Sequence, residues 1–335
     1  MYLQVFGCVA CVPRFPSVLM YGSEIPSEFS SAVDIDIQRI SFENIDEMTY
    51  MDPLLIQGYE NTKFHNLPTD PETLVQYLLR NFGETVVPVS FGTPVTLSEW
   101  YENKAGRYLK DWHINQTKTV FSTPPKLGDW LNDYHTGIGA AKLDFQFLYW
   151  GDEGTSTGYH EDVAGTFSWS YNLRGSKRWR FFIKRDPHVP VVITCVQKPG
   201  EMIFVPSGCF HAVDNLVDDT ISINQNWFND KNLQSVIKRV IDDSLEAQRR
   251  FRMFDIIFES NIAELEQIEF VTKSNNDLNA SLLCDIILYR LQTHNNSREE
   301  LSMISRSVAN MVVLPQYSLI DDKMCAIRQF FEQLV

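Results

Sequence analysis

The stretch Gly154-Thr-Ser-Thr-Gly-Tyr-His160-Glu-Asp162 decides how the rest of this chain is interpreted. Side chains alternate between the two faces of a β-strand, so a histidine and an aspartate two residues apart point to the same side. A second histidine, His211, follows about fifty residues later and can meet this pair only if the chain folds back beside the first strand. The three residues therefore predict a folded-back sheet that carries a cluster of metal-ligand side chains.

The segments on both sides of this stretch have the pattern of strands and tight turns. Phe145-Gln-Phe-Leu-Tyr-Trp150 is an aromatic, strand-like run that breaks at the turn signal Gly151-Asp-Glu-Gly154. Further on, Phe167-Ser-Trp-Ser-Tyr-Asn-Leu173 mostly alternates apolar and polar residues, and Arg174-Gly175-Ser176 indicates a hairpin turn. The return strand of this hairpin is expected over Lys177-Arg-Trp-Arg-Phe-Phe182.

The second histidine lies in a segment with equally clear signals. Glu201 to Val205 predicts a strand, Pro206-Ser207-Gly208 predicts a tight turn, and His211 starts the next strand. The proline and glycine are expected to shape the turn that aims His211 and to take no part in chemistry. Two imidazoles and one carboxylate on one side of a metal form the facial triad of non-haem Fe(II) oxygenases, which leaves coordination positions open.

The spacing of these residues resembles a known family. Gly154-x5-His160-x-Asp162 and Gly200-x5-Pro206-x-Gly208-x2-His211-x3-Asn215 resemble the two motifs of the cupin barrel, and with Lys177 they resemble the jumonji-C (JmjC) class of Fe(II)- and 2-oxoglutarate-dependent oxygenases. Within that class the chain resembles the jumonji domain-containing protein 4 subfamily over residues 40–250. Five flanking segments carry that closer match: Tyr108–His113, Asp129–Asn132, Phe167–Ser170, Gly200–Gly208 and Asp219–Asn224.

The resemblance implies a fold and a role for each candidate residue. The implied fold is mainly β with α: a double-stranded β-helix (cupin, jelly-roll) barrel with flanking helices and a C-terminal helical region. His160, Asp162 and His211 would hold Fe(2+). Lys177 would hold the distal carboxylate of the cosubstrate 2-oxoglutarate by a charge-assisted hydrogen bond, and O2 would be the oxidant. Further candidates for the cosubstrate pocket are, by position, Thr157, Ser170 and Asn224.

Several of these assignments have plainer alternatives. Lys177-Arg178 follows a turn, where a solvated basic pair is the common case, and Thr157 also suits a turn. The sequence singles out no tyrosine for the cosubstrate pocket, although this class often has one there. His113 is expected to be structural rather than a fourth ligand. Three tryptophans are expected in the barrel core rather than in a platform for the substrate: Trp169, Trp179 and Trp227.

Composition restricts the partners and the compartment. The chain has 335 residues, 44% of them hydrophobic, which suffices for one large domain with an appendage or for two domains. Its formal net charge of −14 argues against a nucleic-acid-binding surface and is compatible with a basic protein partner. No apolar run is long enough to span a membrane. Six scattered cysteines do not resemble a disulfide framework, so a reducing compartment is expected, the cytoplasm and with it the nucleus.

The pattern divides the chain into three parts. Residues 1–40 contain prolines and a serine-rich run and predict a poorly ordered lead-in, in which Cys8-x-x-Cys11 is expected to bind no metal. Residues 41–229 are assigned to the JmjC catalytic domain, with the barrel motifs at 145–227. Near its start, Ile45 to Ile56 suits part of a helix interrupted by a proline, and the strand expected after that helix is not apparent.

Sequence patterns typical of helices occur before and after the predicted barrel segment. Asp70-Pro71-Glu72 predicts a helix start, and shorter helices are expected over Thr96–Lys104 and Gly128–Tyr134. In residues 230–335, apolar residues repeat at helical spacing, and Ser297-x-x-Glu300 resembles a capping box. These C-terminal helices are expected to pack on the barrel, with a homodimer through them as the alternative.

The substrate is implied by the resemblance alone. The subfamily is associated with lysyl C-hydroxylation of the eukaryotic translation termination (release) factor that recognises stop codons. The implied function is therefore a protein lysyl hydroxylase acting on that factor. The alternatives are a histone or protein lysine demethylase of the same class and a catalytically inactive cupin that binds a protein or metabolite. The absence of zinc-ligand arrays and of a basic stripe in the sequence disfavours the histone demethylase.

Overall fold

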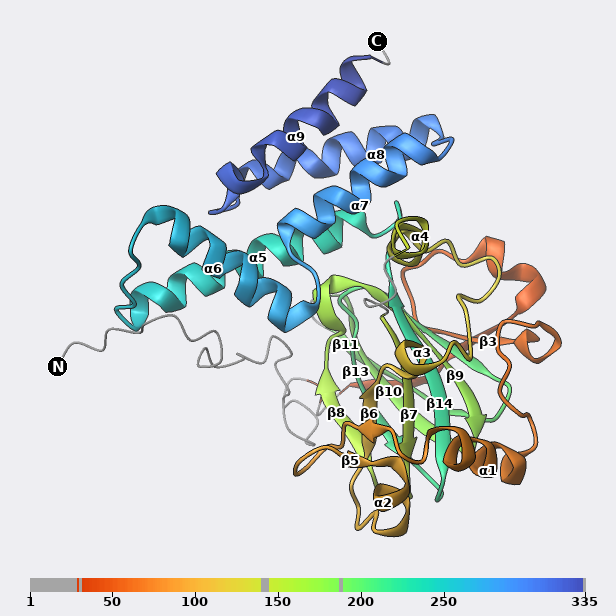
Figure 1. Cartoon of the computed structure of the whole chain (residues 1–335). Helices are drawn as coiled ribbons and strands as arrows, with labels where there is room; N and C mark the ends of the chain where they lie inside the picture. The colour runs from red at the N-terminus through yellow and green to blue at the C-terminus, as the bar shows by residue number, and fades with distance from the viewer. Residues whose placement is uncertain (1–28, 30–31, 140–144, 187–188, 334–335) are drawn as a thin grey trace.

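The computed structural model describes residues 29, 32–139, 145–186 and 189–333, and a β-barrel of two sheets forms its centre (Figure 1). The five-stranded sheet has the order β1 (Val33–Asp36), β11 (Val189–Gln197), β10 (Lys177–Asp186), β13 (Phe210–Asn215), β8 (Ser156–His160). The seven-stranded sheet has the order β2 (Gln38–Ser41), β3 (Leu54–Gln57), β12 (Met202–Val205), β9 (Phe167–Arg174), β14 (Thr220–Trp227), β7 (Gln146–Gly151), β6 (Leu109–Trp112). A separate two-stranded ribbon joins β4 (Val86–Val87) to β5 (Val95–Thr96).

The chain path from β7 to β14 is that of a double-stranded β-helix. Strands β7, β9, β12 and β14 lie in the larger sheet, and β8, β10, β11 and β13 lie in the smaller one. A hydrophobic cluster joins the two sheets, with Trp179 and Phe181 from the smaller sheet and Ile203 and Val205 from the larger one. The fold class predicted from the sequence is therefore confirmed.

The central strands of the larger sheet are buried on both faces. Every residue of β14 is buried, and so is β9 up to Leu173. On the outer face, Trp169 and Trp227 belong to a hydrophobic cluster that includes residues of helix α1 (Pro71–Phe82) and helix α2 (Leu97–Glu102). The residues that alternate with these tryptophans face the barrel interior, where Ser168 and Ser170 of β9 and Asn224 and Asn226 of β14 line a cavity.

Two expectations about the N-terminal part are wrong. Residues 33–41 are not a loosely ordered lead-in: β1 pairs with β11 and β2 pairs with β3, both in parallel, so the segment extends both sheets. Ile45 to Ile56 is not part of a helix either. It contains the end of the 3-10 helix η3 (Phe42–Glu47) and then β3, which pairs with β12 and supplies the strand that the sequence did not reveal. Cys8-x-x-Cys11 lies outside the described residues.

The helices predicted before the barrel are present, and their first residues make the capping contacts expected of helix starts. Helix α1 begins after Asp70, whose carboxylate accepts a hydrogen bond from the Thr73 amide, and Pro71 takes the first helical position. Helix α2 begins with a capping box between Thr96 and Glu99. Two short helices follow: α3 (Ile114–Thr117) and α4 (Trp130–Gly137).

The C-terminal helices pack against the barrel at one end (Figure 1). They are α5 (Leu233–Met253), α6 (Asn261–Asn276), α7 (Ala280–Thr293), α8 (Arg298–Val308) and α9 (Tyr317–Glu332), with the 3-10 helix η6 (Ala309–Val313) after α8. Their shared hydrophobic cluster includes Phe147 of β7 and Ala164 of the 3-10 helix η5 (Val163–Gly165), so it is continuous with the barrel wall. The capping box predicted at Ser297 is present at the start of α8. Among the described residues, no helix is long and apolar enough to cross a membrane.

Candidate metal and cosubstrate site

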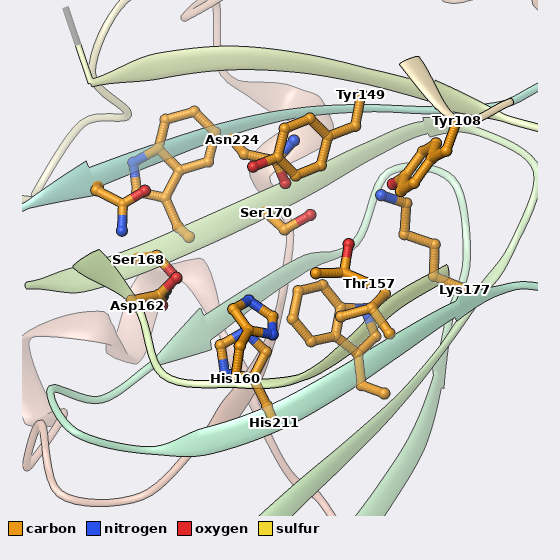
Figure 2. Close-up of a pocket in the computed structure, with 14 residues that line it drawn as sticks. Tyr108, Tyr149, Thr157, His160, Asp162, Ser168, Ser170, Lys177, His211 and Asn224 are labelled. Carbon is orange, nitrogen blue, oxygen red and sulfur yellow. Dashed lines mark hydrogen bonds between the residues drawn. The ribbon is translucent and has the colours of Figure 1, made fainter. Parts of the chain in front are cut away.

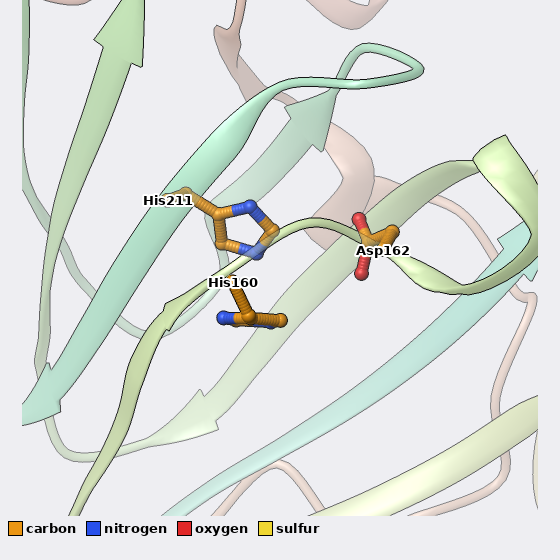
Figure 3. Close-up of side chains that lie close together, drawn as sticks. All are labelled: His160, Asp162 and His211. Carbon is orange, nitrogen blue, oxygen red and sulfur yellow. The ribbon is translucent and has the colours of Figure 1, made fainter. Parts of the chain in front are cut away.

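Three metal-ligand side chains meet where strands β8 and β13 end their pairing (Figure 3). His160 is the last residue of β8 and lies opposite His211 of β13 in the register of the sheet. Asp162 follows two residues later, at the residue that precedes η5. One ligand atom from each of the three lies within 4.8 Å of the other two. In the described part of the chain this is the one group of three or more histidine, cysteine and acidic side chains close enough to share an ion.

Both imidazoles are oriented by their own backbone. The His160 Nδ1 lies 2.7 Å from the carbonyl oxygen of Gly158, and the His211 Nδ1 lies 3.0 Å from that of Cys209. Because a carbonyl can only accept, Nδ1 donates in each contact, and the neutral ring keeps the Nε2 lone pair for a metal. Burial, together with the neighbouring His211, lowers the pKa of His160 to about 4, so this ring is neutral at pH 7.

A serine orients the carboxylate of the cluster. The Ser168 hydroxyl donates to Oδ2 of Asp162 at 2.6 Å, which leaves the other carboxylate oxygen available as a ligand. Two neutral imidazoles and one carboxylate form the donor set that suits Fe(II) with open positions. Each of the three side chains also has a hydrogen bond that fixes its direction, as metal ligands in proteins usually do. The residues present therefore fit an iron ion.

Lys177 lies inside the barrel with its charge uncompensated. Its side chain is 1% exposed, and its Nζ donates to the Ser222 hydroxyl at 2.5 Å. No carboxylate of the described residues lies within 4 Å of this amine, and burial lowers the pKa of Lys177 to about 7. Arg178 points the opposite way, with a half-exposed side chain that pairs with Asp214. The alternative of a solvated basic pair therefore does not describe Lys177.

One pocket of about 460 Å³, mouth included, joins the lysine to the metal-ligand cluster (Figure 2). Figure 2 shows Lys177 and Tyr108 at one end of the pocket and the two histidines with Asp162 at the other. All three further candidates line it: Thr157, Ser170 and Asn224. The Ser170 hydroxyl is buried without a hydrogen-bond partner in the described structure, whereas Asn224 donates to the Ser222 hydroxyl at 3.0 Å. An uncompensated cation and an unpaired hydroxyl in one cavity suit a small anionic ligand.

Sequence reasoning missed two tyrosines of this pocket. Tyr149 lies on β7 opposite Ser222, its ring centre is 5.6 Å from the Lys177 amine, and its hydroxyl donates to Asp111 at 2.7 Å. Tyr108 is buried just before β6. Burial raises the pKa of both phenols, so they stay neutral donors. The period-two pattern could have revealed Tyr149, but Tyr108 is placed only by the pairing of β6 with β7.

The remaining aromatic candidates are packed against hydrophobic neighbours, and Trp169 and Trp179 also line the pocket. The ring of His113 packs edge-on against Phe147 at a centroid distance of 4.7 Å and does not belong to the metal-ligand cluster. Trp169, Trp179 and Trp227 are all buried in hydrophobic clusters. Trp179 also lies parallel to the His211 ring at 5.7 Å and so forms part of the wall behind that imidazole.

Comparison with known proteins agrees with this geometry. Residues 185–227 match the family described as JmjC domain, hydroxylase. The chain is 32% identical over 219 residues to the 2-oxoglutarate and iron-dependent oxygenase JMJD4 of Mus musculus, which covers 48% of this chain and 51% of that protein. For the Homo sapiens protein of the same name the identity is 34% over 215 residues, with the same coverage. The arginine-specific demethylase JMJ20 of Arabidopsis thaliana is 32% identical over 256 residues, covering 63% of this chain and 51% of that protein.

The chain thus spans about half the length of the curated relatives it matches. The matched family segment includes His211 and ends with β14, whereas His160, Asp162 and Lys177 precede it. The resemblance to the JmjC oxygenases, and within them to JMJD4, is confirmed.

Proposed function

We propose that this chain is an Fe(II)- and 2-oxoglutarate-dependent dioxygenase that hydroxylates a protein, with a lysyl side chain of the translation release factor as its substrate. The observation that carries the proposal is the buried, uncompensated Lys177 amine in the same pocket as His160, Asp162 and His211. A cupin that bound only a protein partner would gain nothing from keeping a buried cation that destabilises it when no ligand is bound. The lysine therefore argues against a module that binds protein alone, and its place in one pocket with three metal ligands favours the enzyme over a module that only binds a metabolite.

Each side chain has a stated task in the proposal. His160, Asp162 and His211 hold Fe(II), and the hydrogen bonds at their second polar atoms keep the donors aimed at it. Lys177 and the Ser222 hydroxyl bind the distal carboxylate of 2-oxoglutarate. Bound together, iron and 2-oxoglutarate supply from O2 an oxidant that hydroxylates a C–H bond.

The polar side chains of the pocket complete the cosubstrate site. The unpaired Ser170 hydroxyl and the Thr157 hydroxyl offer donors along the pocket, and Asn224 holds Ser222 toward the lysine. The ring of Tyr149 packs close to the lysine amine and excludes water from its surroundings. Because the amine is buried, water screens its charge toward a bound carboxylate less than it would at the surface.

Charge and resemblance support a basic protein substrate. The net charge of −14 favours association with a basic polypeptide and disfavours nucleic acid. The choice of a lysyl residue of the release factor as substrate rests on the resemblance to the jumonji domain-containing protein 4 subfamily. That substrate implies a cytoplasmic location, with the nucleus as the second possibility. Two relatives are named arginine-specific demethylases, which supports demethylation of a methylated basic side chain as the second candidate function. A homodimer through the C-terminal helices is a further proposal.

Succinate release tests the proposed activity. The chain, reconstituted with Fe(II) under anaerobic conditions and then given O2, should convert 2-oxoglutarate to succinate, faster with a release-factor peptide that contains the target lysine. The peptide should gain one oxygen atom by mass, and a peptide with arginine in place of that lysine is the matched control. Formaldehyde release from a methylated arginine peptide, without hydroxylation of the lysine peptide, would favour the demethylase. No succinate from iron-loaded protein would favour the inactive cupin.

Binding of 2-oxoglutarate should weaken as the pH rises above 7. Burial lowers the pKa of Lys177 to about 7, so below that pH the free protein already carries the charge that pairs with the carboxylate. Above it, the neutral amine must take up a proton on binding, which weakens the affinity about tenfold per pH unit. Tyr108 and Tyr149, the titratable side chains beside the amine, have raised pKa values and stay neutral over this range.

Calorimetry of the Mn2+-saturated protein at pH 7, 8 and 9 measures this dependence. Titrations in buffers of different ionisation enthalpy should show uptake of nearly one proton per 2-oxoglutarate bound at pH 8.5. A dissociation constant that stays flat from pH 7 to 9, with no proton uptake, would contradict the charge state assigned to Lys177.

A further inference from the structure

Helix α5, the first helix after the barrel, lies against both turns that carry the candidate metal ligands. We call these the ligand turns: residues 161–165, which contain Asp162, and residues 206–208, which lead into the strand of His211. Pairing between β8 and β13 extends as far as His160 opposite His211. Beyond that pair no ladder hydrogen bonds between these strands hold Asp162 relative to His211, so other contacts must fix the distance.

The first ligand turn is inserted into the hydrophobic cluster of the helices. Ala164 is fully buried and shares that cluster with Leu233, Val236 and Ile237. Its φ of 53° is left-handed, a conformation that is unfavourable for a residue with a side chain and persists only where the surroundings enforce it. The following Gly165 also has a positive φ of 63°.

Helix α5 leaves little room for a side chain at Gly165. A Cβ there would lie 3.1 Å from the backbone oxygen of Ser235 and 3.3 Å from the Cβ of Arg239, both on α5. The backbone of the first ligand turn therefore rests directly on the helix.

A chain of polar contacts runs from α6 through α5 to the residue between two ligands. The Arg239 Nη1 lies 3.5 Å from Oε2 of Glu161, and its Nε donates to Asp243 at 3.1 Å. The Asp243 carboxylate in turn accepts a hydrogen bond from the side-chain Nδ2 of Asn276, on α6, at 2.9 Å. Glu161 stands between His160 and Asp162 in sequence. The helix therefore contacts the turn at a residue whose displacement would move both neighbouring ligands.

The second ligand turn contacts Asn232, the residue at the N-cap position of the same helix. Asn232 precedes α5 and is 3% exposed. Its Nδ2 donates to the Ser207 hydroxyl at 2.8 Å, and its Oδ1 accepts from the Asn229 amide at 3.0 Å. Helix α5 thus contacts the turn of Asp162 in two places, through the Arg239 side chain and through its backbone beside Gly165. Asn232, directly before the helix, contacts the turn that precedes His211.

We propose that α5 braces the metal site, with Asn232 and Arg239 as positioning residues that hold the two ligand turns at the distance one ion requires. The inference rests on the proposed function, because it needs a metal at the three ligands. It assigns the C-terminal helices a part in the active site beyond packing. Residues that orient metal ligands typically contribute ten- to a hundredfold to metal affinity.

Two substitutions on neighbouring residues of α5 test the brace in the full-length chain. Arg239→Gln removes the side chain that reaches Glu161, and Lys238→Gln removes an exposed pair with Asp242 one residue away. The dissociation constant for Mn2+, measured from the EPR signal of the free ion, should rise about tenfold in Arg239→Gln and less than twofold in Lys238→Gln. Arg239→Lys should restore part of the affinity, since it keeps a positive charge near the Glu161 carboxylate.

Further variants separate positioning from folding. Asn232→Ala should also weaken Mn2+ about tenfold at temperatures well below its Tm, and adding Ser207→Ala should cost little more because both changes break one contact. Glu161→Gln weakens the contact between Glu161 and Arg239 by a change in the turn and leaves the sequence of α5 unaltered. Combined with Arg239→Gln, it should weaken binding no further than either change alone.

The measurements distinguish a failure of the proposed brace from a failure of the proposed metal site. Wild-type affinity for Mn2+ in Arg239→Gln and Asn232→Ala, even with a lowered Tm, would overturn the brace and leave the metal site standing. A wild-type chain that binds no Mn2+ would overturn the proposed function and the brace together.

Discussion

Lys177→Met should abolish 2-oxoglutarate binding and at the same time stabilise the protein that has no cosubstrate. The Lys177 side chain is 1% exposed, and no carboxylate of the described residues lies within 4 Å of its amine. Methionine fills a similar volume without a charge to desolvate. Replacing buried ionic groups by apolar ones of similar size stabilises folded proteins by about 1–4 kcal/mol, and we expect a gain within that range.

The pH dependence of this gain has a definite sign. Burial lowers the pKa of Lys177 from 10.5 in the unfolded chain to about 7, so the folded state binds this proton less tightly. The destabilisation is fully present below pH 7 and disappears as the pH rises toward 10.5. The advantage of Lys177→Met in thermal or urea unfolding should therefore be largest at pH 6–7 and should shrink at pH 9.

Calorimetry with Mn2+-loaded protein measures the loss of binding. Leaving a buried carboxylate without its cation costs about 3–5 kcal/mol, so the affinity for 2-oxoglutarate should fall at least a hundredfold. Arg178→Met is the matched control, because the neighbouring side chain points outward to Asp214, and it should bind like the wild type. If Lys177→Met keeps the cosubstrate within threefold of the wild-type affinity, the lysine does not hold the carboxylate.

His160→Ala should reduce metal affinity by more than a thousandfold. The substitution removes one of three protein donors, and an alanine leaves no nitrogen in reach of the ion. The affinity for 2-oxoglutarate in the presence of metal should fall with it, because the iron-binding keto acid end loses its partner. Binding of Mn2+ followed by EPR, and of 2-oxoglutarate followed by calorimetry, measure the two effects.

His113→Ala is the informative control for this substitution. The His113 ring packs against Phe147 of β7, and we expect its loss to lower the Tm without changing metal affinity. Loss of Mn2+ binding in His113→Ala alone, with His160→Ala unaffected, would place the metal elsewhere in the barrel.

The barrel strands and the metal-ligand cluster could be predicted because their signals are local. Alternation with a period of two fixes which residues of β9 and β14 share a face, and Pro206 and Gly208 mark the turn before His211. Strands β1, β2 and β3 were missed because each has four residues, too few to show a period, whereas the equally short β12 is marked by the turn Pro206-Ser207-Gly208 that follows it. Their partners are also distant: Val33 pairs with Val191, beyond the reach of any local pattern.

Alternation alone could not decide which of two neighbouring basic residues faces inward. Lys177 and Arg178 are equivalent by pattern, and the resemblance to the oxygenase class selected the first. Nor could the sequence reveal the contacts of α5 with the ligand turns. Its apolar repeat predicts the buried stripe of the helix, but Asn232 and Arg239 lie outside that stripe, and what they touch depends on tertiary packing.

The central claim is that one iron ion is held by two imidazoles and one carboxylate with a lysine deeper in the same pocket. A crystal structure of the chain soaked anaerobically with Fe(II) and 2-oxoglutarate, with anomalous data at the iron edge, tests it most directly. We expect one anomalous peak, with a nitrogen of His160, a nitrogen of His211 and an oxygen of Asp162 each at about 2.0–2.2 Å. The distal carboxylate of 2-oxoglutarate should lie on the Lys177 amine. Iron bound elsewhere, or a carboxylate that leaves this amine unpaired, would contradict the account.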